Sequence, residues 1–365
     1  MIKNRNPFIY FIITFGMFLP CFLSAQEKMP NSHYVAYQPA SSISIDGKLE
    51  EKEWGKVAWT SDFINIIGRD HPAPKFSTRV KMLWDKKYFY IAAELEEPNL
   101  WSEITKRDAV IFHENDFEVF IDPDGDTHHY YEIEINALGT VWDLILKKPY
   151  RDGGPADSSW DIDGLKKGIH LDGTLNNGED IDEKWTVELA IPWKAFNDFY
   201  SNKKSPENGE QWRVNFSRVH WDTEWKEGQY IKKTDPETGK NLPEYNWVWA
   251  PQGAIAMHKP EMWGFVQFSK IVAGEGPADF VEKAEEKVKW ELRQLYYLQK
   301  AYFKKHKKYS EDLTTLQKES EWRFSEDLKM EATASKFEIK FPIIDQQKVW
   351  HIREDGKCWD TTLKK

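Results

Sequence analysis

Two segments of the chain combine indole rings with polar side chains, a mixture that suits carbohydrate binding. Arg218, Trp221 and Trp225 lie together at the end of a predicted strand, and a later segment contains Trp247 and Trp249. The face of an indole packs against the apolar C–H face of a pyranose, while neighbouring polar groups bind the sugar hydroxyls. We therefore expect Arg218, Trp221, Trp225 and Trp247 to contact a glycan. Trp247 and Trp249 share one face of a strand, a pattern that suits a protein core as well.

Aromatic residues are more numerous than a core of this size needs. The chain has 18 Trp, 15 Tyr and 21 Phe, and a buried Trp needs a partner for its N–H as well as space for its ring. Part of this set is therefore expected on a recognition surface. Trp142 and Trp160 are further candidates, Trp160 because it lies in a loop rich in Gly, Asp and Ser. Four other tryptophans are expected in the core: Trp54, Trp84, Trp185 and Trp193.

An acidic turn follows one predicted strand and offers oxygen ligands at alternate positions. Asp122, Asp124 and Asp126 surround Gly125 in this turn. Three carboxylates at this spacing suit a structural Ca²⁺, although the later Glu of an EF-hand is missing. An acidic hairpin turn without any metal fits the same residues. No other cofactor is expected.

The sequence contains none of the common catalytic motifs. Gly-x-Ser-x-Gly and His-Glu-x-x-His are absent, and no Cys–His arrangement is present. Pairs of carboxylates are plentiful in a chain this acidic, so they do not by themselves indicate a glycosidase. His128 and His129 are adjacent, and neighbouring residues of a strand point to opposite faces. We therefore predict a binding protein rather than an enzyme.

The first 25 residues have the composition of a secretory signal. Lys3 and Arg5 precede an apolar run, and small residues end at Ala25. The prediction is an exported protein that is periplasmic, on the cell surface or extracellular, with no membrane span after cleavage. Removal of Lys3 and Arg5 moves the formal net charge from −10 to −12. Nucleic acid and anionic membranes are therefore disfavoured as partners. Only Cys358 remains after cleavage, which excludes an intramolecular disulfide.

Short runs with a period of two dominate the chain from about residue 34 to residue 268. They are rich in aromatic and β-branched residues and are separated by turn residues, as in a mainly β, antiparallel sandwich of the jelly-roll kind. The clearest predicted strands are 79–84, 88–93, 117–121, 131–135, 140–146, 185–191 and 212–219.

The pattern changes to a helical one after Pro277. From Val281 to Tyr302, apolar residues recur at steps of three and four, with Asp279 as the predicted N-cap. Two predicted strands follow, at 336–343 and 348–359, with a turn at Asp355-Gly356. The predicted organisation is a signal at 1–25, a β-sandwich at 30–271, and a subdomain of an amphipathic helix and a small hairpin at 272–365.

Five sequence blocks resemble the family 9 carbohydrate-binding modules and occur in the family's order. They are Ile-Asp-Gly-Lys-Leu at 45–49 with Glu-Trp at 53–54, the hairpin at 80–90, Asn-Asp-Phe-Glu-Val-Phe-Ile-Asp at 115–122, Lys-Trp-Thr-Val-Glu-Leu-Ala-Ile-Pro-Trp at 184–193, and Lys-Pro-Glu-Met-Trp-Gly at 259–264. Together they cover roughly residues 40 to 270. The resemblance implies a non-catalytic β-sandwich of the kind attached to xylanases, which clamps the end of a glycan between two tryptophans and has structural calcium nearby.

The resemblance assigns candidate ligand contacts position by position. The first clamp tryptophan corresponds to Phe112, and the glutamate that binds sugar hydroxyls corresponds to Glu118. A sugar-binding arginine corresponds to Glu134, so that contact is not preserved. The second clamp tryptophan falls near Met257, beside His258. We therefore expect the fold to transfer, while the way the ligand binds stays open.

The function expected from these observations is binding of a polysaccharide or oligosaccharide by aromatic stacking and hydrogen bonds, in support of polysaccharide catabolism. One alternative is a glycoside hydrolase, or a subunit of a glycan-degrading enzyme, that carries this module. Another is a haem-binding redox domain with the related DOMON-like sandwich, in which Met257 or His258 would need a distant partner ligand.

Overall fold

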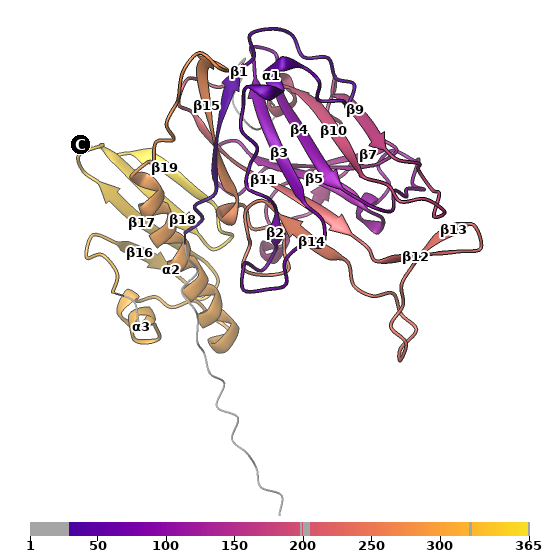
Figure 1. Cartoon of the computed structure of the whole chain (residues 1–365). Helices are drawn as coiled ribbons and strands as arrows, with labels where there is room; N and C mark the ends of the chain where they lie inside the picture. Colours follow the sequence, from indigo (N-terminus) through magenta and orange to yellow (C-terminus); the bar gives the residue numbers. More distant parts are fainter. Residues whose placement is uncertain (1–28, 198, 200–204, 321–322, 364–365) are drawn as a thin grey trace, which may run out of the picture.

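The computed structural model describes residues 29–197, 199, 205–320 and 323–363. The predicted signal at 1–25 lies outside these residues. Most of the chain before residue 273 forms two β-sheets that pack on one another as a sandwich (Figure 1). The predicted fold class, a mainly β sandwich, is therefore confirmed.

Strand β1 joins the two sheets, because it pairs with one strand of each. The first sheet has the order β8-β7-β6-β5-β11-β15-β1 and the second the order β1-β3-β4-β10-β9, with β14 and β2 continuing from β11. The strands of the first sheet are β1 (His33–Gln38), β2 (Ile64–Asn65), β5 (Asp116–Asp122), β6 (Tyr130–Asn136), β7 (Val141–Leu146), β8 (Ala156–Asp157), β11 (Gln211–His220), β14 (Tyr245–Val248) and β15 (Gly264–Val272). The second sheet adds β3 (Thr78–Trp84), β4 (Tyr88–Glu96), β9 (Lys166–Asp172) and β10 (Lys184–Pro192).

The pairing of β1 is the one departure from the predicted antiparallel order. It runs parallel to β15 and, through Tyr37 and Leu83, parallel to β3, whereas the other strand pairs are antiparallel. Strand β1 is short, and apolar and polar residues do not alternate clearly along it. Its two partner strands come from distant parts of the chain. The sequence could not indicate such a pairing, because parallel partners are not joined by a local turn.

The core between the sheets is strongly aromatic. Trp84, Trp193, Trp212 and Phe268 contact one another edge to face, with ring centroids 5.2 to 6.3 Å apart. The predicted core positions of Trp54, Trp84, Trp185 and Trp193 are confirmed, since each is at most 4% exposed. The remaining elements of the sandwich region are α1 (Lys52–Gly55), the short hairpin β12 (Thr223–Lys226) and β13 (Gln229–Lys232), and the 3₁₀ turns η1 (Ile111–His113), η2 (Tyr150–Asp152), η3 (Trp193–Phe196) and η4 (Pro260–Met262).

The C-terminal part has its own core between a helix and a four-stranded sheet. Leu292, Leu295 and Tyr296 of the helix pack against Ile339 and Ile352 of the sheet. The elements are α2 (Glu285–His306), α3 (Leu313–Lys318), β16 (Lys329–Ala332), β17 (Phe337–Ile343), β18 (Lys348–Arg353) and β19 (Cys358–Thr362). Two strands were expected here and four are present.

The long helix begins later than its apolar pattern suggested. Asp279 is not its N-cap, and α2 starts at Glu285 after Ala284. The backbone before it is bound to the sandwich instead, because Gln267 Nε2 donates to Asp279 O and Val281 N donates to Gln267 Oε1. The predicted turn at Asp355-Gly356 is present, where Gly356 has a positive φ of 82°.

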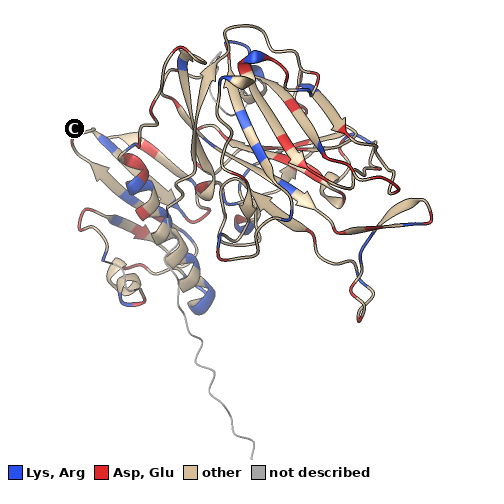
Figure 2. Ribbon diagram, in the orientation of Figure 1, with Lys and Arg blue, Asp and Glu red and all other residues tan. Residues whose placement is uncertain are grey.

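Ion pairs bind the C-terminal subdomain to the sandwich. Arg213 of β11 lies 2.8 Å from Glu286 of α2, and Glu286 also accepts from Lys289 at 2.9 Å. Figure 2 shows how α2 carries charged residues of both signs along its length. Although burial opposes it, the attraction of Lys289 and Arg213 lowers the pKa of Glu286 to about 2. Among the described residues, no helix is both long enough and apolar enough to cross a membrane.

Neutralising Glu286 should loosen the docking of α2. Glu286→Gln leaves the buried Arg213 without its carboxylate, so we expect the free energy of unfolding to fall by about 3 kcal/mol at pH 7. Because the pKa of Glu286 is lower in the folded state, its contribution is complete above about pH 4.5 and is lost as the pH falls towards 2. Chemical denaturation at several pH values measures both effects.

The exposed Glu282 provides the matched control for this substitution. Glu282→Gln should change the unfolding free energy by less than about 0.5 kcal/mol. Equal stability of wild type and Glu286→Gln at pH 7 would show that the ion pair does not hold the subdomain in place.

Candidate functional site

Strands β5 and β6 present carboxylates on the face that points away from the sandwich core. Side chains alternate along each strand, so Phe117 and Val119 of β5 enter the core while the residues between them point the other way. The carboxylates on this second face are Asp116, Glu118, Glu132 and Glu134, which we call the carboxylate row. All four are at most 5% exposed.

Strand register places members of the row directly opposite one another. Glu118 pairs with Glu134 across β5 and β6, and Glu134 pairs with Trp142 across β6 and β7. On the other side, Glu118 pairs with Ser217 of β11. A line of side chains from Ser217 to Trp142 therefore crosses four strands of the sheet on one face.

An aromatic rim lies beside this line. The rings of Phe112 and Trp142 have centroids 6.4 Å apart and planes inclined by 29°. Phe112 is 37% exposed, and its backbone N–H donates to Glu134 Oε2 at 3.0 Å. Trp221 is attached to the same loop, because its Nε1 donates to Phe112 O at 2.9 Å. Lys232 Nζ lies 3.3 Å from the centroid of the Trp221 ring, so it covers one face of that indole.

Burial and mutual repulsion raise the pKa of every carboxyl in the row. Burial is the larger cause throughout, and the pKa of Glu118 rises to about 7. Neighbouring carboxylates add to it: Glu118 acts on Asp116, Glu132 and Glu134. Within the described part of the chain, no Lys, Arg or His forms an ion pair with any member of the row. The row therefore gathers buried carboxyl groups that lack a counter-ion among the described residues, and this environment favours their protonated form.

Met257 and His258 lie at the other end of the same face. His258 Nδ1 is 3.0 Å from Tyr130 OH, and the exposed ring of Tyr150 packs against the imidazole at 4.5 Å. Met257 is buried in a small cluster with Phe120. Burial, with the nearby Arg151 guanidinium, lowers the pKa of His258 to about 4, so this imidazole is neutral at pH 7.

Four of the sequence-predicted contacts lie elsewhere. Arg218 and Trp247 point into the interior, where Arg218 binds Glu97 at 2.8 Å and each is 1% exposed. Alternation along β11 places Arg218 on the opposite face from Ser217, which lies beside the row. Trp160 packs against Tyr131 at the edge of the core. Trp225 lies in the β12–β13 hairpin against Tyr230.

The acidic turn of Asp122, Asp124 and Asp126 is largely satisfied by the protein itself. Asp122 accepts from the backbone N–H groups of Gly125 and Thr127, and Asp126 accepts from His128. Lys357 of the C-terminal subdomain lies 2.8 Å from Asp126 Oδ2. Calcium at this turn stays a prediction, and an ion there would compete with the Lys357 ammonium for Asp126.

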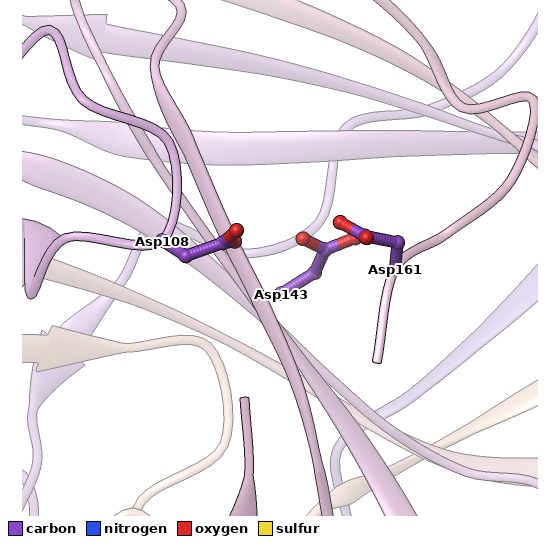
Figure 3. Close-up of side chains that lie close together, drawn as sticks. All are labelled: Asp108, Asp143 and Asp161. Carbon is purple, nitrogen blue, oxygen red and sulfur yellow. The ribbon is translucent and has the colours of Figure 1, made fainter. Parts of the chain in front are cut away.

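A third group of carboxylates has a guanidinium as its counter-ion. Figure 3 shows Asp108, Asp143 and Asp161 close together. Arg107 binds both Asp143 and Asp161, and Asp143 also accepts from the backbone N–H of Ile162. Arg107 therefore provides a counter-ion within this group.

Asp116, Glu132 and Tyr150 were not predicted as site residues. The signal was present, because Asp116-x-Glu118 and Glu132-x-Glu134 place carboxylates at alternate positions between core residues. Such spacing predicts one shared strand face. What the sequence lacked was the register that brings the two pairs together.

Because Arg218 lies in the interior, we predict that it contributes to the stability of the fold. Arg218→Met removes the guanidinium from Glu97, which is 2% exposed and retains His220 and Asn115 as side-chain partners, so the unfolding free energy should fall by about 3 kcal/mol. The double variant Arg218→Met/Glu97→Gln should recover part of this loss. The control Arg79→Met breaks a partly exposed pair with Glu94 and should cost less than about 1 kcal/mol. Equal losses for Arg218→Met and Arg79→Met would contradict this role.

Comparison with known proteins agrees with this architecture. The model of a family described as "Carbohydrate family 9 binding domain-like" matches residues 45–247. Exoglucanase XynX of Acetivibrio thermocellus is 28% identical over 151 residues, which are 41% of this chain and 12% of that protein. Endo-1,4-beta-xylanase C of Paenibacillus barcinonensis is 32% identical over 89 residues, 24% of this chain and 7% of that protein. The chain thus spans only a small part of these relatives.

Two similar solved structures are carbohydrate-binding proteins by their descriptions. A putative carbohydrate-binding protein from Bacteroides uniformis has 16% identity and a TM-score of 0.48, covering 65% of this chain and 99% of that one. A family 9 module from Caldicellulosiruptor kristjanssonii, in complex with cellotriose, has 15% identity and a TM-score of 0.41, covering 67% and 99%. Because the family model covers more than half of its residues, this chain belongs to the family 9-like carbohydrate-binding domains.

Proposed function

We propose that this protein is exported and binds a polysaccharide or oligosaccharide at the rim formed by Phe112, Trp142 and Trp221, without cleaving it. The observation that carries the proposal is the exposed Phe112 ring beside Trp142, on the face of the sheet away from the core. An exposed aromatic ring beside a partly buried indole, held by a sheet, is a surface that suits a pyranose face. Membership of a carbohydrate-binding family supports the same conclusion.

The geometry of the pair favours stacking on one side rather than a clamp. A sugar ring held between two aromatic planes needs about 7 to 8 Å, twice a normal carbon–carbon contact distance. The centroids of Phe112 and Trp142 are only 6.4 Å apart, so a sugar does not fit between them and would stack on the exposed Phe112 ring. Lys232 and Glu244, which are partly exposed near this rim, are the polar groups we propose for the sugar hydroxyls.

Burial of the carboxylate row supports a role in binding rather than catalysis. A glycosidase needs one carboxyl in contact with the glycosidic oxygen and a second near the anomeric carbon. Glu118 and Glu134 are 5% and 2% exposed, which leaves no surface for either contact. The alternative of a complete hydrolase is instead suggested by the relatives, in which a matching segment is a small part of a longer enzyme. We do not propose haem, because Met257 and His258 are adjacent in the chain and either would need a distant partner ligand on the other side of the iron.

The proposal predicts which aromatic side chains a glycan requires. Affinity electrophoresis through gels containing xylan, mannan, β-glucan, pectin or host glycans would identify the ligand. Phe112→Ala and Trp142→Ala should each weaken binding about five- to tenfold, because one stacking contact contributes about 1 kcal/mol. The variant Trp225→Ala, run in the same gels, tests whether the β12–β13 hairpin contributes to glycan binding.

Trp59 provides the matched control, since this partly buried indole lies beside Arg79 and Lys81 on the other sheet. Trp59→Ala should leave retardation unchanged. Equal retardation of wild type and Phe112→Ala would show that the Phe112 ring does not contribute to glycan binding. Release of reducing sugar from a glycan by the wild-type protein would show that it is a hydrolase and would contradict the proposed non-catalytic role.

A further inference from the structure

A small cavity lies where the C-terminal subdomain meets the sandwich. Helix α2 contributes Lys289 and Arg293 to its wall, β11 contributes Arg213, and β19 contributes Cys358. The volume of the cavity is about 20 Å³, and one water molecule needs roughly 10–15 Å³. The space therefore suits one small occupant that both parts of the chain would contact.

Three cationic side chains line this cavity and share one carboxylate. Arg213 and Lys289 both contact Glu286, at 2.8 and 2.9 Å. Among the described residues, Glu286 is the one acidic group that forms an ion pair with any of the three cations. Glu261 also lies in the wall, but its carboxylate is held by Arg151 at 2.8 Å. The lining thus has more positive than negative charge.

Arg293 is the cation of the wall whose charge is not paired. The residue is 3% exposed, and its Nη2 donates to Gly356 O at 2.7 Å and to Thr127 Oγ1 at 3.3 Å. Its Nη1 is buried and has no hydrogen-bond partner in the part of the chain that the structure describes. A buried guanidinium with an unused donor and no counter-ion is costly. An anion that accepts from Nη1 would offset both costs.

The acidic turn borders the cavity through Gly125 and Thr127, yet its carboxyl groups are engaged elsewhere. Asp122 accepts from the backbone N–H groups of both residues, and burial raises the pKa of Asp122 and so favours its neutral form. Asp126 is paired with Lys357 at 2.8 Å. These two groups therefore repel an anion in the cavity less than two free carboxylates would.

We propose that this cavity binds one monovalent inorganic anion of the size of chloride. A halide accepts hydrogen bonds from any direction, so one ion can serve the Arg293 guanidinium and the Lys289 ammonium together. The volume suits a single atom better than sulfate or phosphate, whose four oxygens need more room than one water molecule. Because the cations come from α2 and β11, the bound anion would hold the subdomain against the sandwich. The site does not depend on the proposed function, because it is measured with no glycan present.

The experiment follows thermal unfolding of the full-length chain after dialysis into halide-free buffer. NaCl or NaBr is added while sodium gluconate keeps the ionic strength constant. The unfolding midpoint should rise with halide, by about 2 °C at a concentration ten times the dissociation constant. Crystals grown in NaBr give a second measurement, in which the anomalous scattering of bromide should show a peak in the cavity beside Arg293.

Variants of the wall test which side chains hold the ion. Arg293→Met and Lys289→Met each remove one cation and should weaken halide binding at least about tenfold. Arg353→Met is the matched control, because it removes the same charge from the same subdomain, where Arg353 pairs with Asp355 at 2.7 Å and does not line the cavity. It should keep the wild-type response to halide. If Arg293→Met does not fold, Lys289→Met and the bromide peak decide the matter.

Two results would overturn the proposal. The first is equal midpoints in chloride and gluconate with no bromide peak in the cavity, which would leave water as the occupant. The second is a halide response that is the same in wild type, Arg293→Met and Lys289→Met, which would assign the halide effect to another part of the protein.

Discussion

The two-residue alternation of strands β5, β6 and β11 is the constraint on which the rest of the structure depends. One face of these strands must be apolar because the sandwich core needs Phe117, Val119 and their neighbours. Core packing fixes the register, since a slip of one residue would exchange the two faces. The same register then sets Glu118 opposite Glu134, whatever that costs electrostatically. The candidate site is thus placed by the packing of the core.

The C-terminal subdomain supplies charges that the sandwich lacks. Helix α2 uses its apolar face to cover its own sheet, so it docks on the sandwich largely through ion pairs and hydrogen bonds. Glu286 neutralises the buried Arg213 of β11, and Lys357 neutralises part of the acidic turn. The subdomain therefore completes the electrostatics of one end of the sandwich. Among the described residues of the subdomain, none forms an ion pair with the carboxylate row, whereas Lys357 does so with the acidic turn.

The candidate site has two layers with different chemistry. The rim offers an aromatic surface with Lys232 and Glu244 beside it, which suits a neutral, hydroxyl-rich ligand. The buried layer holds carboxyl groups in a low-dielectric setting, where burial and mutual repulsion raise their pKa and favour the protonated form. Glu134 belongs to both layers, because it accepts the backbone N–H of Phe112.

The sequence alone determined the fold class, the main strands and the family, because period-two alternation and five ordered blocks are local patterns. It also identified Phe112, Glu118 and Trp142, which the structure brings to one face. The tertiary structure alone decided that Arg218 and Trp247 are interior, that β1 joins both sheets in parallel, and that four carboxylates form one row. Those outcomes depend on which strands pair and in what register. Pairing is a long-range property set by packing of the whole core, and no local pattern encodes it.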